Sequence, residues 1–293
     1  MKRENGSWTA EGVAFFRALE SACPEGERRC YDPLAQHLLN PWLRLVYRNR
    51  FRRWIARIYV GLRHGRAAVH IVARTSYIDF RLSECIDDGI EQLVILGAGF
   101  DSRAFRFPEL RAGVSVFEVD HPATQRRKLE RLKKVFGTLP SHVTFVPVDF
   151  EREPLEQRLL ESGYDRGLQT LFIWEGVVMY LPAESVDETL AFITRNSATG
   201  SSIIFDYVYE SLLEGRSEDS RAWRAYLERI GEPPRFGIEE GVIEEFLNSR
   251  GLLLVENWTD EALKGTRFSR VVKSSYPVRE VAPHGGICLS VKP

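Results

Sequence analysis

The chain has 293 residues, 44% hydrophobic and 28% charged, which is enough to bury a full core as one large α/β domain. Its 40 basic and 41 acidic residues give a formal net charge of −1, so there is no global attraction to nucleic acid or to acidic membranes. Four scattered cysteines without a C-x-x-C motif argue against a disulfide framework or a zinc site and suit a reducing compartment.

Residues 1–90 are predicted to form an N-terminal helical cap. The first residues, "MKRENGSWTAEG", are polar and lack the apolar segment of a signal peptide, and no apolar run in the chain approaches membrane-spanning length. We therefore expect a cytoplasmic protein without a membrane partner.

Within this cap, no Asp or Glu occurs between Asp32 and Asp79. The arginines and the interleaved aromatic residues of this stretch are Arg44, Arg48, Arg50, Arg52, Arg53, Arg57, Arg63, Arg66 and Arg74, with Trp42, Tyr47, Phe51, Trp54 and Tyr59. Three interpretations are open: solvated helices with buried aromatic faces, a lid over an anionic substrate, or a nucleic-acid-binding surface.

From residue 91 onward, short apolar runs alternate with amphipathic stretches. Strands are predicted at 93–99, 114–120, 142–150, 169–174 and 201–209, and helices at 123–137, 153–163 and 182–200. Alternation of strands and helices over this length predicts a Rossmann-like α/β fold, with a mostly parallel sheet and helices on both faces.

The C-terminal part carries a predicted helical insertion and two further strands. Helices are expected at 217–230 and 238–249, followed by a strand at 252–258. The tail "PHGGICLSVKP" is expected to add a last edge strand. Residues 91–293 are thus predicted to form one core domain.

Four successive strand ends carry glycines or carboxylates, and ligands of open α/β sheets bind at such ends. The residues concerned are Gly97, Gly99, Asp120, Asp149, Phe150 and Glu175. A dinucleotide would favour a third glycine where Ser102 stands, and Asp101 would repel its phosphates. A P-loop lysine is absent.

S-adenosylmethionine fits these strand ends better, because it has no phosphate and is cationic at sulfur. Asp120 is placed to accept hydrogen bonds from the ribose hydroxyls and Asp149 from the adenine amino group, with Phe150 against the purine. Glu175 lies where the methionyl end is expected, and Arg74 is a candidate clamp for the methionyl carboxylate.

Five ordered segments resemble the leucine carboxyl methyltransferase family: "RTSYIDF", "ILGAGFDSRAFRF", "EVDHP", "VDFE" and "WEGVVMYL". The segment "YDPLAQHLL" also resembles the N-terminal region of its bacterial members, and the likeness covers roughly residues 32–181. The resemblance implies S-adenosylmethionine as cofactor, with S-adenosylhomocysteine as product. The residues that match the family's cofactor site are Arg74, Gly97, Gly99, Asp120, Asp149, Phe150 and Glu175.

Several polar residues near these motifs have structural interpretations. Asp101 is as well suited to capping the next helix as to touching a ligand. Asp79 is expected to be structural, and Glu118 to face solvent or to cap. His121 is the nearest histidine, but the turn into Pro122 is a sufficient reason for its position.

These residues predict an S-adenosylmethionine-dependent O-methyltransferase without an assigned catalytic residue. A small-molecule carboxylate, as in polyketide-type products, is favoured because it needs no general base. The alternatives are a hydroxyl acceptor, a tRNA-modifying enzyme and a non-catalytic cofactor-binding protein. The arginine-rich stretch is predicted to close over an anionic acceptor, and the sheet is expected to bind cofactor without it.

Overall fold

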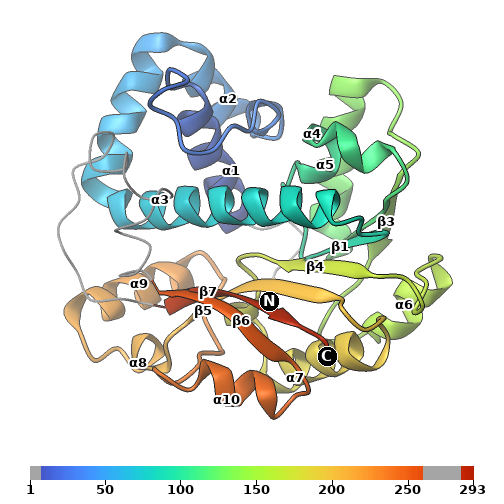
Figure 1. The fold of residues 1–293 in the computed structure, drawn as a ribbon. Coiled ribbons are helices and arrows are strands. Elements are labelled where there is room, and N and C mark those ends of the chain that lie inside the picture. The colour runs from blue at the N-terminus through green and yellow to red at the C-terminus, as the bar shows by residue number, and fades with distance from the viewer. Residues whose placement is uncertain (1–7, 260–284) are drawn as a thin grey trace.

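A computed structural model describes residues 8–259 and 285–293. Within them, a seven-stranded sheet has the strand order β3-β2-β1-β4-β5-β7-β6 (Figure 1). The strands are β1 (Gln92–Leu96), β2 (Ser115–Asp120), β3 (Val143–Pro147), β4 (Thr170–Trp174), β5 (Ser202–Val208), β6 (Leu253–Thr259) and β7 (Gly285–Val291). The first five are parallel to one another, whereas β7 runs antiparallel to both β5 and β6.

Alternate residues of the central strands point into two separate hydrophobic cores. In β1, Leu93 and Ile95 face one core, and Val94 and Leu96 face the other. Because the strand is buried on both faces, its sequence is continuously apolar rather than alternating.

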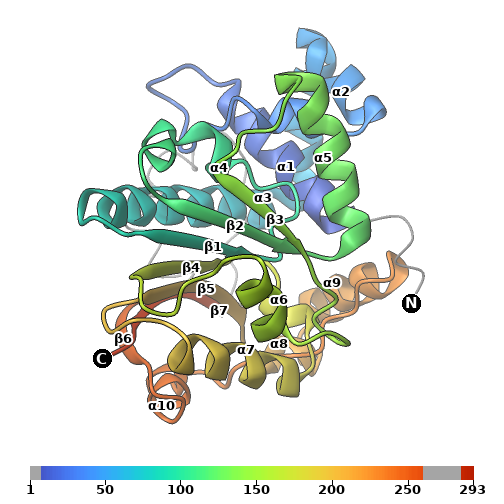
Figure 2. The ribbon, with the colours of Figure 1, turned by 90° about the vertical axis from the view of Figure 1, so that its right-hand side faces the viewer.

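Helices cover both faces of the sheet (Figure 2). On one face lie α3 (Arg50–Asp87) and α5 (Pro122–Phe136), and on the other lie α6 (Leu155–Glu161), α7 (Ala183–Arg195) and α10 (Ile243–Asn248). The predicted α/β class and its N-terminal helices are therefore confirmed.

The N-terminal residues form helices that pack directly on the sheet. They are α1 (Trp8–Ser21), the 3-10 turn η2 (Ala35–His37), α2 (Pro41–Arg48) and α3. Tyr77, Ile78 and Leu82 of α3 share one core with Leu93 and Ile95 of β1. The N-terminal helices therefore share a hydrophobic core with the sheet that follows residue 90.

Helix α3 is 38 residues long and has a non-helical backbone at His64. Its second half is buried against the sheet, but its first half exposes Phe51, Trp54 and Tyr59. Trp42 of α2 is exposed as well, whereas Tyr47 is buried. The interpretation of this stretch as solvated helices with buried aromatic faces is therefore wrong for four of its five aromatic residues.

The remaining described elements are short or lie after β5. They are α4 (Arg103–Arg106), the 3-10 turns η3 (Pro108–Arg111) and η4 (Val178–Tyr180), α8 (Glu210–Leu213) and α9 (Glu218–Arg229). The described part of the chain contains no helix that is both long and apolar enough to cross a membrane.

Two C-terminal predictions need correction. The tail forms a strand, but β7 lies between β5 and β6 rather than at an edge. All its residues from Gly285 to Ser290 are buried, which explains the short apolar run "GICL". The helix expected at 238–249 is only α10, at 243–248.

Candidate functional site

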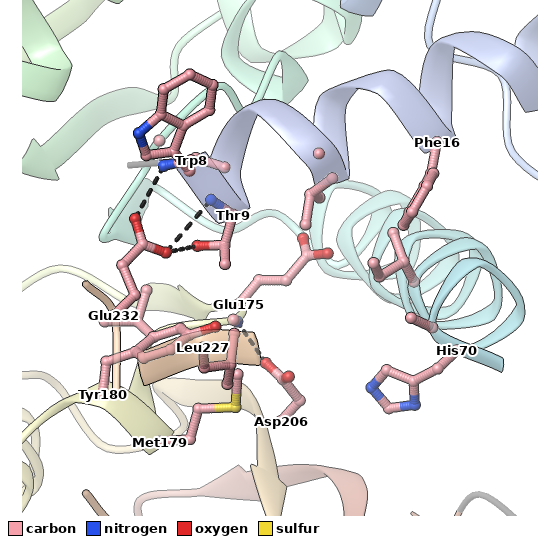
Figure 3. A pocket seen from close by; sticks show the side chains of 18 of the residues that line it. Trp8, Thr9, Phe16, His70, Glu175, Met179, Tyr180, Asp206, Leu227 and Glu232 are labelled. Atoms are coloured by element: carbon pink, nitrogen blue, oxygen red, sulfur yellow. Dashed lines mark hydrogen bonds between the residues drawn. The ribbon is translucent and has the colours of Figure 1, made fainter. Parts of the chain in front are cut away.

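A cavity of about 1810 Å³ opens at the carboxyl ends of the parallel strands. Its walls come from α1, α3, the loops after β1 and β4, and the segment that follows α9. In Figure 3, Glu175, Tyr180 and Asp206 lie on the sheet side, opposite the first turn of α1. The sheet and the N-terminal helices therefore build one site together.

The loop after β1 requires glycine at two positions. Gly97 and Gly99 have positive φ angles of 64° and 46°. A Cβ atom at Gly97 would overlap the side chain of Val177, and one at Gly99 would lie 3.3 Å from the Cβ of Ala10 in α1. The predicted glycine loop is thus closely covered by its neighbours, and both residues line the cavity.

Asp120 ends β2 beside this loop and lines the cavity. Its Oδ2 accepts a hydrogen bond from the backbone N–H of Gly99 at 2.6 Å, and its Oδ1 accepts one from that of His121, also at 2.6 Å. These bonds fix the orientation of the carboxylate. Each carboxylate oxygen has two lone pairs and can accept more than one hydrogen bond.

The predicted adenine pair is only partly brought to the cavity. Phe150 lines it, together with Val148. Asp149 is not a lining residue, and its Oδ1 accepts from the backbone N–H of Glu151 at 3.2 Å, which closes the local turn. Its contact with an adenine amino group stays a prediction.

Arg74 bridges two buried carboxylates at the centre of the site. Its Nε donates to Glu175 at 2.9 Å, and its Nη1 donates to Asp206 at 2.5 Å. Its Nη2 is 3.3 Å from the position that a Cβ atom at residue 176 would occupy. A clamp on a ligand carboxylate therefore stays a prediction, with two guanidinium nitrogens already engaged by the protein.

A second buried arginine, Arg103, gathers three carboxylates. Its Nη1 donates to Glu175 at 2.6 Å, its Nε donates to Asp79 at 2.7 Å, and it also pairs with Asp101. Asp101 accepts from the Arg103 backbone N–H at 2.7 Å as well. Asp79 is structural as expected, and the two carboxylate oxygens of Asp101 are both engaged by Arg103.

These ion pairs set the charge state of the site. Burial alone would raise the pKa of Glu175, but the positive charges of Arg103 and Arg74 outweigh it and hold that pKa well below its ordinary value. Burial likewise would lower the pKa of Arg74, and the charges of Asp206 and Glu175 raise it instead. Glu175 and Arg74 are therefore both ionised at neutral pH.

Glu118 of β2 does not face solvent or cap a helix. It is buried, with an oxygen 2.7 Å from the Nζ of Lys128 in α5, which is buried too. The prediction for this residue is wrong because β2 is covered on both faces. His121 accepts a hydrogen bond from the backbone N–H of Ala123 through Nδ1 and caps the start of α5, as its turn position suggested.

The first turn of α1 covers the glycine loop and is hydrogen-bonded to a residue that is distant in sequence. Glu232, after α9, accepts from the backbone N–H groups of Trp8 at 2.8 Å and Thr9 at 3.3 Å, and from the Thr9 hydroxyl (Figure 3). Arg17 of α1 donates to the carbonyl oxygen of Phe100 at 2.5 Å. The glycine loop is therefore held by α1 as well as by Asp120.

Sequence reasoning missed three residues of this site. Asp206 carried a signal, since it is an acid inside the otherwise apolar strand segment "SIIFD". Arg103 lies in the "FDSRAF" motif but was given no role. Glu232 has no local signal, because its partners lie more than 220 residues away.

Comparison with known proteins decides the family. The sequence pattern of the leucine carboxyl methyltransferase family matches residues 10–194, which is more than half of the chain. The chain belongs to the leucine carboxyl methyltransferase family. It is an S-adenosylmethionine-dependent methyltransferase, in agreement with the sequence motifs.

Bacterial relatives and one solved structure extend this result. YktD of Bacillus subtilis, named as a candidate S-adenosylmethionine-dependent methyltransferase, is 36% identical over 68% of this chain and 66% of its own. A Streptomyces coelicolor protein with the same description is 37% identical over 67% of this chain and 68% of its own. A DUF574 family protein from Streptomyces avermitilis shares the fold, with a TM-score of 0.60, 12% identity, and coverage of 96% of this chain and 97% of that one.

The cavity of this methyltransferase suits S-adenosylmethionine. The glycine loop lines the cavity, and Asp120 offers oriented acceptors for ribose hydroxyls. Phe150 offers an apolar face for a purine, and the acids Glu175 and Asp206 suit a cationic methionyl end. Because the walls include α1 and α3, the expectation that the sheet binds cofactor without the N-terminal segment has no support in the structure.

Proposed function

We propose that this methyltransferase acts on a carboxylate oxygen of a small anionic molecule. S-adenosylmethionine supplies a methyl group on a sulfonium, which is already a strong electrophile. The family's description, leucine carboxyl methyltransferase, supports a carboxyl acceptor. The observation that carries the proposal is that Glu175 and Tyr180, two titratable side chains that line the cavity, are poor bases.

Glu175 and Tyr180 illustrate this point. The lowered pKa of Glu175, set by Arg103 and Arg74, leaves its carboxylate with little basicity. Burial raises the pKa of Tyr180 well above its ordinary value, and the nearby charge of Glu232 raises it further, so the phenol stays protonated and does not act as a base. A carboxylate acceptor is ionised at neutral pH and needs positioning rather than deprotonation.

The outer wall of the cavity supports an anionic acceptor. Arg63 of α3 and Arg229 of α9 both line the cavity and are exposed. A guanidinium forms strong, geometrically specific bonds with carboxylates, so these residues are candidate acceptor contacts. Under this proposal, α3 provides both the wall that excludes water and the charge that attracts the acceptor.

A hydroxyl acceptor is the second candidate, and one observation favours it. His70 of α3 lines the cavity (Figure 3). It precedes Arg74 by four residues, which is about one helical turn. A histidine titrates near neutrality and is the commonest general base. Hydroxyl methylation at this site would therefore depend on His70, whereas carboxyl methylation would not.

The two candidates are separated by the chemistry of the product. The full-length protein is incubated with S-adenosylmethionine labelled in the methyl group and a panel of small carboxylic acids and phenols. We expect label in products that release methanol in mild alkali, as methyl esters do and methyl ethers do not.

His70→Asn provides the second arm of this experiment. For a carboxylate acceptor the transfer rate should change less than about threefold, whereas loss of a general base costs about 10²- to 10⁴-fold. His142→Asn is the matched control, because that side chain contacts the carbonyl of Ala104 and does not line the cavity. Alkali-stable product together with a large His70→Asn effect would establish the hydroxyl reaction instead.

A further inference from the structure

The first half of α3 and the adjoining α2 expose large apolar side chains to solvent, and we call this region the α2–α3 surface. Its large exposed residues are Trp42, Leu45, Phe51, Trp54, Ile55, Ile58, Tyr59 and Leu62. Trp42 and Leu62 are each 70% exposed, and Phe51 is 66% exposed. A cluster of this size on one face indicates an interaction site rather than scattered exposure.

The spacing along α3 places these side chains on one stripe. At about 100° per residue, the apolar residues between Phe51 and Leu62 fall in a single arc on the helix. Arg50 lies at one border of this arc, and Arg52 and Arg63 lie at the other. The buried residue Val60 lies on the opposite side, toward the core. The outward face of α3 is thus a basic amphipathic stripe.

The charge of the surface is uniformly positive. Residues 33–78 contain no Asp or Glu, and Arg48, Arg50, Arg52 and Arg63 are exposed. None of these four arginines pairs with a carboxylate among residues 8–259 and 285–293. The net charge of −1 for the whole chain therefore conceals a local field that attracts anions.

We propose that the α2–α3 surface docks on an anionic lipid bilayer. Aromatic and aliphatic side chains on one helix face, bordered by arginines, match the headgroup and acyl boundary of such a bilayer. A second copy of the chain is disfavoured, because a symmetric contact would oppose the same arginines. The segment 260–284 is disfavoured too, since it carries five basic and three acidic residues.

Docking would also place the cavity at the lipid surface. Tyr59 and Leu62 belong to the exposed stripe and line the cavity, so the cavity reaches solvent beside the α2–α3 surface. An amphipathic molecule could then pass between the bilayer and the cavity. The docking inference itself does not depend on which acceptor the enzyme methylates.

Co-sedimentation of the full-length protein with vesicles tests the inference. We expect binding to vesicles of phosphatidylcholine with phosphatidylglycerol, weak binding to phosphatidylcholine alone, and loss of binding as salt rises. Arg50→Gln with Arg52→Gln should lower the partition coefficient about 30-fold, from about 1 kcal/mol for each basic residue near an anionic surface. Phe51→Ser with Trp54→Ser should lower it at least about tenfold.

Matched controls remove the same groups elsewhere. Arg152→Gln with Arg166→Gln removes two exposed charges, and Leu253→Ser with Val255→Ser removes two exposed apolar side chains of β6. Neither pair should change partitioning more than about twofold, and circular dichroism checks that all variants fold.

Three results would overturn the inference. The first is an absence of binding to anionic vesicles. The second is equal loss of binding in the variants and their controls. The third is self-association or RNA binding that is lost in the same variants, in a protein that does not bind vesicles.

Discussion

At the scale of single residues, the site depends on buried charges that are compensated in pairs. Arg74 is 5% exposed and has carboxylates of β5 and of the loop after β4 on either side. Removing charges from water is costly, and close ion pairs repay the cost only when both partners are present. The arginine therefore has a structural role in addition to any contact with the cofactor.

This arrangement predicts that Arg74→Lys will not rescue Arg74→Ala. A single ammonium cannot reach Glu175 and Asp206 with the planar geometry of a guanidinium, so one buried acid loses its partner. We expect Arg74→Ala to lower the free energy of unfolding by about 3 kcal/mol or more, and Arg74→Lys to recover less than half of that.

Denaturant unfolding measures the stability, and calorimetry with S-adenosylhomocysteine measures the cofactor affinity of the same variants. Arg195→Lys, at an exposed position near the end of α7, is the control and should change neither quantity. Full recovery of both by lysine would mean that Arg74 acts as a simple positive charge.

The sequence was informative about single residues only where local patterns constrain them. Gly97, Gly99, Asp120 and Glu175 lie at strand ends, and the strands were recognisable as apolar runs. The ion-pair partners were not predictable, because the contact of Arg74 with Asp206 joins positions 132 residues apart. Such contacts depend on how the elements pack.

At the scale of elements, α1 connects the cofactor loop to the C-terminal half of the chain. Arg17 anchors it to the loop after β1, and Glu232 accepts from the N–H groups of its first turn. Free N–H groups at a helix start need such an acceptor, and a negative charge there is favourable. The Glu232 contact thus determines whether the first turn of α1 stays closed over the cavity.

Glu232→Ala should therefore open the first turn of α1 without unfolding the protein. Loss of a cap costs about 1 kcal/mol, which corresponds to roughly fivefold more frequent opening of the turn. Hydrogen exchange at Thr9 and Ala10 should accelerate by that factor, and S-adenosylhomocysteine affinity should fall. Glu214→Ala, which removes an exposed ion pair with Arg216 and does not line the cavity, is the control. Unchanged exchange at these amides would show that Glu232 does not hold the helix.

Element prediction succeeded for the repeating units and failed at the C-terminal side. Parallel strands with intervening helices have a recognisable alternation, and Ser217 and Ile230 mark the ends of α9 as expected. The position of β7 was missed because pairing order is not encoded in local pattern. The continuous burial of β7 from Gly285 to Ser290 is what a strand inside a sheet requires, and its short apolar run was the only local indication of that position.

At the scale of the whole molecule, the two predicted regions fold as one unit around the sheet. The cofactor cavity draws walls from both, and α3 shares its core with β1. A buried charge next to any strand of this sheet therefore contributes to the free energy of unfolding of the whole protein. The pair of Glu118 and Lys128, between β2 and α5, is such a case because both side chains are only 1% exposed.

The carboxyl of Glu118 predicts how global stability changes with pH. Burial raises its pKa from 4.5 to about 7, although Lys128 partly opposes the shift. Between these values the folded state holds a proton that the unfolded state has released. This group therefore stabilises the fold most below about pH 4.5, and its contribution declines as the pH rises to about 7, by up to about 3 kcal/mol.

Glu118→Gln isolates this effect, since an amide does not titrate. The difference in unfolding free energy, variant minus wild type, should grow between pH 5 and pH 8 in favour of the variant. Glu175 and Asp101 have lowered pKa values, so their contributions are lost only as the pH falls below about 4 and do not overlap with this window.

Glu245→Gln, at an exposed position of α10, is the control and should show a constant difference. Denaturant unfolding at four pH values makes the measurement. A constant difference for Glu118→Gln as well would mean that Lys128 keeps this buried acid ionised throughout.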